Sequence, residues 1–128
     1  MIQRIQTIWL FLIAVLSALL LFTPIVDKLS VSPYDLLFTI GNGLVAVLAL
    51  VTIFLYKKRP LQIKLCYGIY VLLMLSFAAV FIDGHIAGQE KTTYIAMSSI
   101  MLALIFGVLA IRAIKKDEDL VRSLNRLR

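Results

Sequence analysis

Cysteine and histidine, the residues that build disulfides and zinc centres, are almost missing from this sequence. The 128 residues include one cysteine, Cys66, and one histidine, His85. A lone cysteine excludes a disulfide within the chain, and a zinc site built by a single chain needs more ligands of this kind. We therefore expect no metal and no cofactor. We interpret Cys66 as a small apolar packing residue rather than a reactive or palmitoylated thiol.

Charged residues are absent from four long stretches of the chain. No Asp, Glu, Lys, Arg or His occurs within residues 5–26, 36–56, 65–82 and 95–111. As a helix rising about 1.5 Å per residue, each stretch is long enough to cross most of a hydrocarbon layer of about 30 Å. Hydrophobic residues make up 62% of the chain and the mean hydropathy is +0.99. A soluble core could not absorb so much apolar surface, because soluble domains are only about half apolar.

These stretches predict an all-α fold, namely a polytopic membrane protein with a four-transmembrane-helix bundle and a cytoplasmic amphipathic C-terminal helix. We place the transmembrane domain in residues 1–116 and a basic amphipathic tail in residues 117–128. The expected spans are residues 5–26, 36–56, 61–82 and 94–114. No room remains for a separate soluble domain.

The positive charges indicate how the spans are oriented. Most of the 13 Lys and Arg residues flank the spans at the N-terminus, the central turn and the tail: Arg4, Lys57, Lys58, Arg59, Lys64, Arg112, Lys115, Lys116, Arg122, Arg126 and Arg128. Only Lys28 and Lys91 fall in the other two loops. Because cations near span ends stay on the cytoplasmic side, both termini are predicted to be cytoplasmic.

Local signals mark where some of the helices begin and end. Ser32 is a candidate N-cap, with Pro33 at the first helical position. Residues 83–85, Asp-Gly-His, are expected to form a turn after the third helix, and Thr92 and Thr93 to cap the fourth. An Asp and a His two positions apart can act as a base or as metal ligands. Without a nucleophile or third ligand nearby, a solvated loop is the preferred interpretation.

Small residues recur at helical spacing in two of the spans. Ser99, Ala103 and Gly107 follow each other every fourth residue and form the clearest packing stripe in the chain. Ala14 and Ala18 form a shorter pair of the same kind. Such stripes let helices approach closely, and the sequence does not decide whether the contact lies within one chain or between two.

The tail combines an apolar face with arginines. The residues that we assign to partner or lipid binding are Arg122, Leu124, Arg126, Leu127 and Arg128. One interpretation, slightly favoured, is an amphipathic helix lying on the inner leaflet. The other is a docking helix for a cytoplasmic protein or ribosomal RNA, since arginine suits carboxylates and phosphates. The acidic triplet at residues 117–119 supports docking, because an anionic leaflet would repel it.

The two ends of the chain carry its most specific patterns. Residues 1–8 read MIQRIQTI, residues 112–118 read RAIKKDE, and residues 120–128 read LVRSLNRLR. These patterns resemble a family of small four-span inner-membrane proteins found chiefly in Bacteroidetes, domain of unknown function 4293, and the resemblance covers the full length. It implies a bacterial inner-membrane location. It implies no activity, because that family has no assigned catalytic or binding residues to carry over.

Three classes of function can be weighed on these residues. We expect a non-enzymatic accessory or scaffold subunit of an inner-membrane complex, whose tail docks a partner that could belong to protein export or the ribosome. The alternative is a small oligomeric transporter or channel for a neutral solute, with Asn42 as one polar candidate. Pathways through bilayers usually contain ionisable residues, and the four charge-free stretches contain no Asp, Glu, Lys, Arg or His. An interhelical hydrogen bond or a close backbone contact is the preferred role of Asn42. An enzyme is the least favoured class, because no nucleophile and base occur at a recognisable spacing.

Overall fold

The computed structural model describes residues 2–22, 33–55, 57–87 and 90–127. These residues form four α-helices: α1 (Ile2–Phe22), α3 (Pro33–Phe54), α4 (Arg59–Ala87) and α5 (Glu90–Arg126). All four helices contain windows apolar and long enough to cross a membrane, with mean hydropathies of 2.3 to 2.4. The prediction of an all-α chain with four helices of this kind is confirmed.

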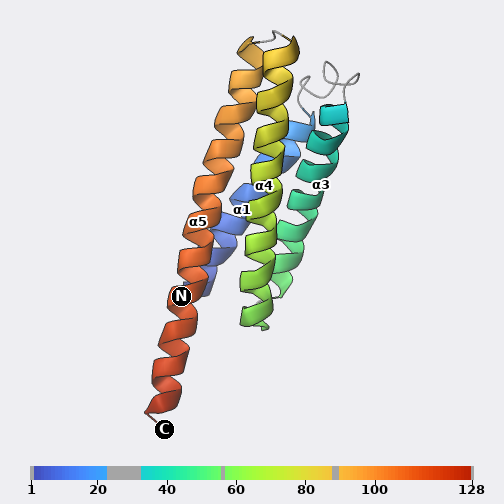
Figure 1. The fold of residues 1–128 in the computed structure, drawn as a ribbon. Helices are drawn as coiled ribbons and strands as arrows, with labels where there is room; N and C mark the ends of the chain where they lie inside the picture. The colour runs from blue at the N-terminus through green and yellow to red at the C-terminus, as the bar shows by residue number, and fades with distance from the viewer. Residues whose placement is uncertain (1, 23–32, 56, 88–89, 128) are drawn as a thin grey trace.

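The helices form an up-and-down bundle in which neighbours run in opposite directions (Figure 1). Helix α1 packs against α3 and α5, and α4 packs against the same two helices, so α1 and α4 are diagonal partners. A tight connection joins α3 to α4, with the amide of Lys58 donating to the carbonyl of Leu55. A connection this short forces the two helices to be antiparallel neighbours. Helix α5 runs well beyond the others at the end where the chain terminates (Figure 1).

Two helix boundaries differ from those expected. The predicted turn at residues 83–85 is wrong, because α4 continues through it to Ala87. A glycine inside a helix costs only about 1 kcal/mol, and the ring of His85 packs on that of Phe81 one turn earlier, with centroids 4.7 Å apart. Helix α5 begins at Glu90, so Thr92 and Thr93 lie within its first turn and are not caps.

The start of α3 is where the sequence predicts it, and the ends of two expected spans lie outside the described residues. Pro33 is the first residue of α3, as the sequence predicts, while Ser32 lies outside the described residues. Residues 23–26 of the first expected span and Tyr56 of the second also lie outside them.

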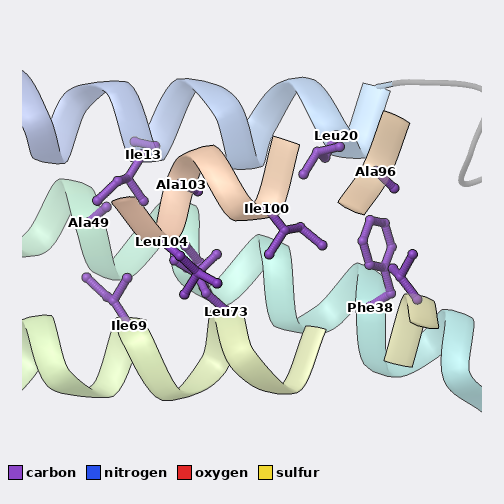
Figure 2. Close-up of a cluster of buried hydrophobic side chains, with 13 residues drawn as sticks. Ile13, Leu20, Phe38, Ala49, Ile69, Leu73, Ala96, Ile100, Ala103 and Leu104 are labelled. Atoms are coloured by element: carbon purple, nitrogen blue, oxygen red, sulfur yellow. The ribbon is translucent and has the colours of Figure 1, made fainter. Parts of the chain in front are cut away.

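The core consists of apolar side chains that each helix places at intervals of three, four or seven residues. Its members are Ile13, Ala14 and Leu20 of α1; Phe38, Val45 and Ala49 of α3; Ile69, Leu73 and Val80 of α4; and Ala96, Ile100, Ala103 and Leu104 of α5. Figure 2 shows these side chains filling the space between the four helices. The spacing places one face of every helix on the bundle axis, which is what a 3.6-residue period requires.

The outer surface of the bundle is apolar as well. Large side chains such as Phe22 and Phe54 are 88% and 80% exposed, and similar residues occur along the outward sides of all four helices. Soluble monomers rarely expose contiguous apolar patches larger than a few hundred Å². Lipid chains accept such a surface without penalty. The structure is therefore that of a bundle suited to a multi-pass membrane protein.

Helices α3 and α4 approach each other closely at Gly41. A Cβ atom at this position would lie 2.8 Å from Oγ of Ser76, closer than side-chain carbons come to other atoms in folded proteins. Gly68, on the exposed side of α4, has no such neighbour within 4 Å. Shape, rather than burial of apolar area, governs packing between helices in lipid. The contact at Gly41 should therefore matter for stability.

We expect Gly41→Ala to lower the stability of the bundle by about 1–3 kcal/mol, the usual cost of overpacking. Adding Ser76→Ala to the same chain removes the obstructing Oγ and should recover most of the loss. Gly68→Ala is the matched control and should be neutral or stabilising, since alanine favours helix by about 1 kcal/mol. Unfolding of the purified protein by heat or SDS in a mild detergent measures all three. Equal changes in stability from Gly41→Ala and Gly68→Ala would contradict a tight contact between Gly41 and Ser76.

Candidate functional site

Six polar side chains are buried inside the bundle, and they come from three of its four helices. They are Gln6 and Ser17 of α1, Asn42 and Thr52 of α3, and Gln62 and Ser76 of α4. None of them is ionisable. The described part of the chain also contains no group of three His, Cys, Asp or Glu residues that could hold a metal ion. These six buried side chains thus offer hydrogen bonds but neither an acid nor a base.

Two glutamines fix helices to each other at the cation-rich end of the bundle, by which we mean the end with the α3–α4 turn and the start of α4. Nε2 of Gln6 donates to the carbonyl oxygen of Ala113 on α5 over 3.2 Å, and Nε2 of Gln62 donates to that of Thr52 on α3 over the same distance. The sequence interpretation did not single out either glutamine. The signal in the sequence is weak, because each glutamine stands one helical turn before an apolar residue, Leu10 or Cys66, and only the structure shows that these two are buried.

Asn42 donates within its own helix and not to another one, whereas the alternative expectation, a close helix contact at its flanking glycines, agrees with the approach of Gly41 to Ser76. Nδ2 of Asn42 donates to the carbonyl oxygen of Phe38 in its own helix over 2.9 Å. The neighbouring Gly41 and Gly43 face Ser76 of α4 and Leu21 of α1, respectively. Successive helical residues are about 100° apart, so Asn42 lies between these two directions and faces the bundle axis. Three buried oxygens have no hydrogen-bond partner within the described part of the chain: Oγ of Ser17, Oδ1 of Asn42 and Oγ of Ser76.

The small-residue positions lie mainly inside the chain. Ala103 and Ala14 belong to the core, and Gly107 is buried, with the ring of Tyr70 3.7 Å from where its Cβ would lie. Ser99 is half-buried and donates its hydroxyl to the carbonyl of Ile95, and Ala18 is also half-buried. Close approach along this stripe is therefore used between helices of one chain.

Cys66 is also buried. It packs in a second apolar cluster with Leu10, Ala110, Ile111 and Ile114, between α1, α4 and α5 near the cation-rich end. A thiol enclosed in this way is a packing residue, consistent with the interpretation made from the sequence.

The acidic triplet of α5 is largely neutralised within the chain. A carboxylate oxygen of Asp117 lies 3.3 Å from a guanidinium nitrogen of Arg59, at the start of α4. Glu118 pairs with Arg122 one turn further along α5, at 2.8 Å. The argument that an anionic leaflet would repel these carboxylates is therefore weaker than the sequence indicated. The Arg59–Asp117 pair instead ties α5 to α4 where α5 leaves the bundle.

Beyond this pair α5 continues without a break, and three of its apolar side chains are exposed. Leu120, Leu124 and Leu127 are 44%, 64% and 85% exposed. Arg122 and Arg126 are exposed on the same turns, and Arg128 lies outside the described residues. This exposed apolar and cationic end of α5, residues 120–127, is the candidate functional site, and we call it the projecting segment.

A comparison with known protein families matches the profile described as "Domain of unknown function (DUF4293)" over residues 2–35 and 27–127. The chain belongs to the DUF4293 family. Comparison with curated proteins and with solved structures found no match in either. The DUF4293 profile covers the projecting segment as well as the bundle, so the long α5 falls within the family domain.

In this DUF4293 chain, we expect Asp117→Arg to destabilise the fold, because it places two cations together at the end of the bundle. Combining it with Arg59→Asp should restore the pair with reversed polarity. Both side chains are partly shielded, at 25% and 14% exposed, so a coupling of up to about 1 kcal/mol is expected. A double-mutant cycle on thermal unfolding measures it, with Glu118→Arg and Arg122→Glu as the control pair within one helix. A coupling of zero between Arg59 and Asp117 would show that the pair is incidental.

Proposed function

We propose that this protein is a non-enzymatic accessory or scaffold subunit of a bacterial inner-membrane complex. In this proposal the bundle is the membrane anchor, and the projecting segment is an amphipathic docking helix for a cytoplasmic partner. The observation that supports it best is the course of α5, which extends past the ends of the other helices with its leucines exposed (Figure 1).

The direction of the projecting segment favours a partner over the lipid surface. A helix bound to a leaflet lies in the plane of the interface, whereas α5 continues along the direction that it has in the bundle (Figure 1). Laying the segment on the membrane would require a sharp bend, and such bends occur at proline, glycine or a π-bulge. Neither proline nor glycine occurs between residues 108 and 127, and the helix there is regular.

The chemistry of the segment fits a protein groove better than RNA. Leu124 and Leu127 gain nothing from a phosphate backbone but can fill an apolar groove, in the way amphipathic helices bind their targets. Arg126 has no ion-pair partner in the described part of the chain, so it is available for a carboxylate at the rim of such a groove. We therefore propose a protein partner with an apolar, acid-rimmed groove.

A transporter for a small neutral solute is the second candidate. The three unpartnered oxygens of Ser17, Asn42 and Ser76 are the observation in its favour. They sit among tightly packed apolar side chains, with no ionisable group buried beside them in the described residues. A path across the bilayer would then have to form between copies of the chain. For this reason we place transport second.

The proposed orientation, with both termini cytoplasmic, can be tested by cysteine labelling. In a Cys66→Ala background, Ser123→Cys and Lys91→Cys each place one thiol at an exposed position near an opposite end of the bundle. A membrane-impermeant maleimide added to cells with a permeable outer membrane should label Lys91→Cys and leave Ser123→Cys unlabelled until the inner membrane is opened. The reverse pattern would overturn the orientation.

The docking proposal is tested by two substitutions that add the same charge to neighbouring residues. Leu124→Asp changes the apolar side of the projecting segment, and Asn125→Asp changes a position about 100° away on the same exposed turn. Proteins cross-linked in native membranes and purified with the intact chain should be lost with Leu124→Asp and kept with Asn125→Asp. An interface residue that fills a pocket typically accounts for a loss of about 2 kcal/mol or more.

A truncation after Lys116 gives the wider control for this experiment. If the same partners remain after truncation, the interface belongs to the bundle and the docking proposal fails. If partners are lost on truncation but equally with both aspartate variants, net charge rather than the leucines governs the contact.

A further inference from the structure

Helices α4 and α5 carry four donor side chains on their outer surface at the cation-rich end, and two of them, Lys115 and Tyr67, are in contact. Nζ of Lys115 donates a hydrogen bond to the hydroxyl oxygen of Tyr67 over 2.8 Å and lies 5.4 Å from the centre of that ring. Lys64 lies one turn from Tyr67 on α4, and Arg112 one turn from Lys115 on α5. All four side chains are exposed. We call this set the groove cluster.

The groove cluster presents hydrogen-bond donors and little else. Because the phenol oxygen of Tyr67 accepts from Lys115, its own proton is free to be donated outward. Lys64 and Arg112 have no ion-pair partner within the described residues. The neighbouring carboxylates of Asp117 and Glu118 are already paired with arginines, which leaves Asp119, one turn from Lys115, as the nearest acidic group on α5. The surface thus holds three cations and a hydroxyl but one exposed acid. This excess of hydrogen-bond donors and positive charge suits a phosphate.

An apolar strip continues from the groove cluster toward the middle of the bundle. Val71 and Met74 follow Tyr67 on α4 by four and seven residues, and Val108 and Met101 precede Lys115 on α5 by seven and fourteen residues. All four side chains are exposed. From Tyr67 to Met74 the strip covers about 10 Å of helix. A phosphate held by the cluster would therefore have apolar protein surface directly beside it on the membrane side, where a lipid carries its acyl chains.

We propose that the outer surface of α4 and α5 at the groove cluster is a binding site for one anionic phospholipid. Arg112, Lys115 and the hydroxyl of Tyr67 hold its phosphate, Lys64 adds charge, and an acyl chain lies along Val71, Met74 and Val108. This site is independent of which leaflet the cation-rich end faces and of any partner at the projecting segment. A general attraction of cations to an anionic membrane would involve all cations at this end of the bundle. The proposed site involves Lys64, Arg112 and Lys115 and not the other cations there.

The test titrates the full-length chain in detergent with phosphatidylglycerol, and with phosphatidylcholine as the neutral comparison, and counts bound lipids by native mass spectrometry. Arg112→Gln with Lys115→Gln removes two cations from the groove cluster. Lys58→Gln with Lys116→Gln removes two exposed cations outside the groove cluster. Lys58 lies in the α3–α4 turn, and Lys116 lies on α5 about 100° around the helix from Lys115. We expect the first pair to weaken phosphatidylglycerol binding roughly fivefold for each cation. The second pair should change it by less than about twofold, as expected of charges outside the site.

Tyr67→Phe gives a variant that keeps the charge and the ring. It should weaken phosphatidylglycerol binding about fivefold, the value of one hydrogen bond, and leave phosphatidylcholine binding unchanged. It also serves if the double groove variant does not fold, as judged by thermal unfolding without lipid.

Three outcomes would overturn the proposal. Equal losses in the two double variants would mean that only the general charge of this end attracts lipid. Equal affinity for phosphatidylcholine would remove the role of the anionic headgroup. Competition by glycerol 1-phosphate at the same concentration as the lipid would identify the groove cluster as a site for free phosphates, with no contribution from the apolar strip.

Discussion

The bundle depends on close fit between helices, because lipid removes the usual driving force for their association. An apolar side chain gains little by leaving an acyl chain for another side chain, so van der Waals contact and hydrogen bonds between helices must hold the fold. The structure meets this constraint with small residues at the contacts. Ala49, Ala96 and Ala103 belong to the core, and Gly41 lets the backbone of α3 approach Ser76 of α4. Gln6 and Gln62 each add a hydrogen bond that joins one helix to another.

The same constraint divides the molecule into an inert part and an accessible part. Within the bundle, buried polar groups are neutral and surrounded by packed side chains, and the outward surface suits lipid. Most exposed charges of the described chain gather at one end, which holds the start of α4, the groove cluster and the projecting segment. There the carboxylates of Asp117 and Glu118 are paired with Arg59 and Arg122, and the remaining cations outnumber the remaining acid, Asp119. Recognition of a protein or of a lipid headgroup is accordingly expected at this end.

Much of the fold could be predicted from the sequence, because the absence of charge over four stretches has one stable solution in a bilayer. Helices satisfy their backbone groups internally, and lipid offers no alternative partner. Helix ends were harder to predict, since outside the bilayer they depend on local contacts such as that between Phe81 and His85. The candidate site was only partly visible for a similar reason. The pairing of Asp117 with Arg59 joins residues far apart in the chain, so the triplet looked like free negative charge. The leucines and arginines of the tail could be recognised because their spacing is local.

The continuity of α5 has a mechanical consequence. From Val108 to Arg126 the helix has neither glycine nor proline to act as a hinge, and its length over these residues is about 27 Å at 1.5 Å per residue. A sideways force on Leu124 would therefore be transmitted along the unbent helix, past the Arg59–Asp117 contact. It would act on the packed face of α5 at Ala103 and Gly107. Forces on the projecting end thus reach the helix contacts at membrane depth.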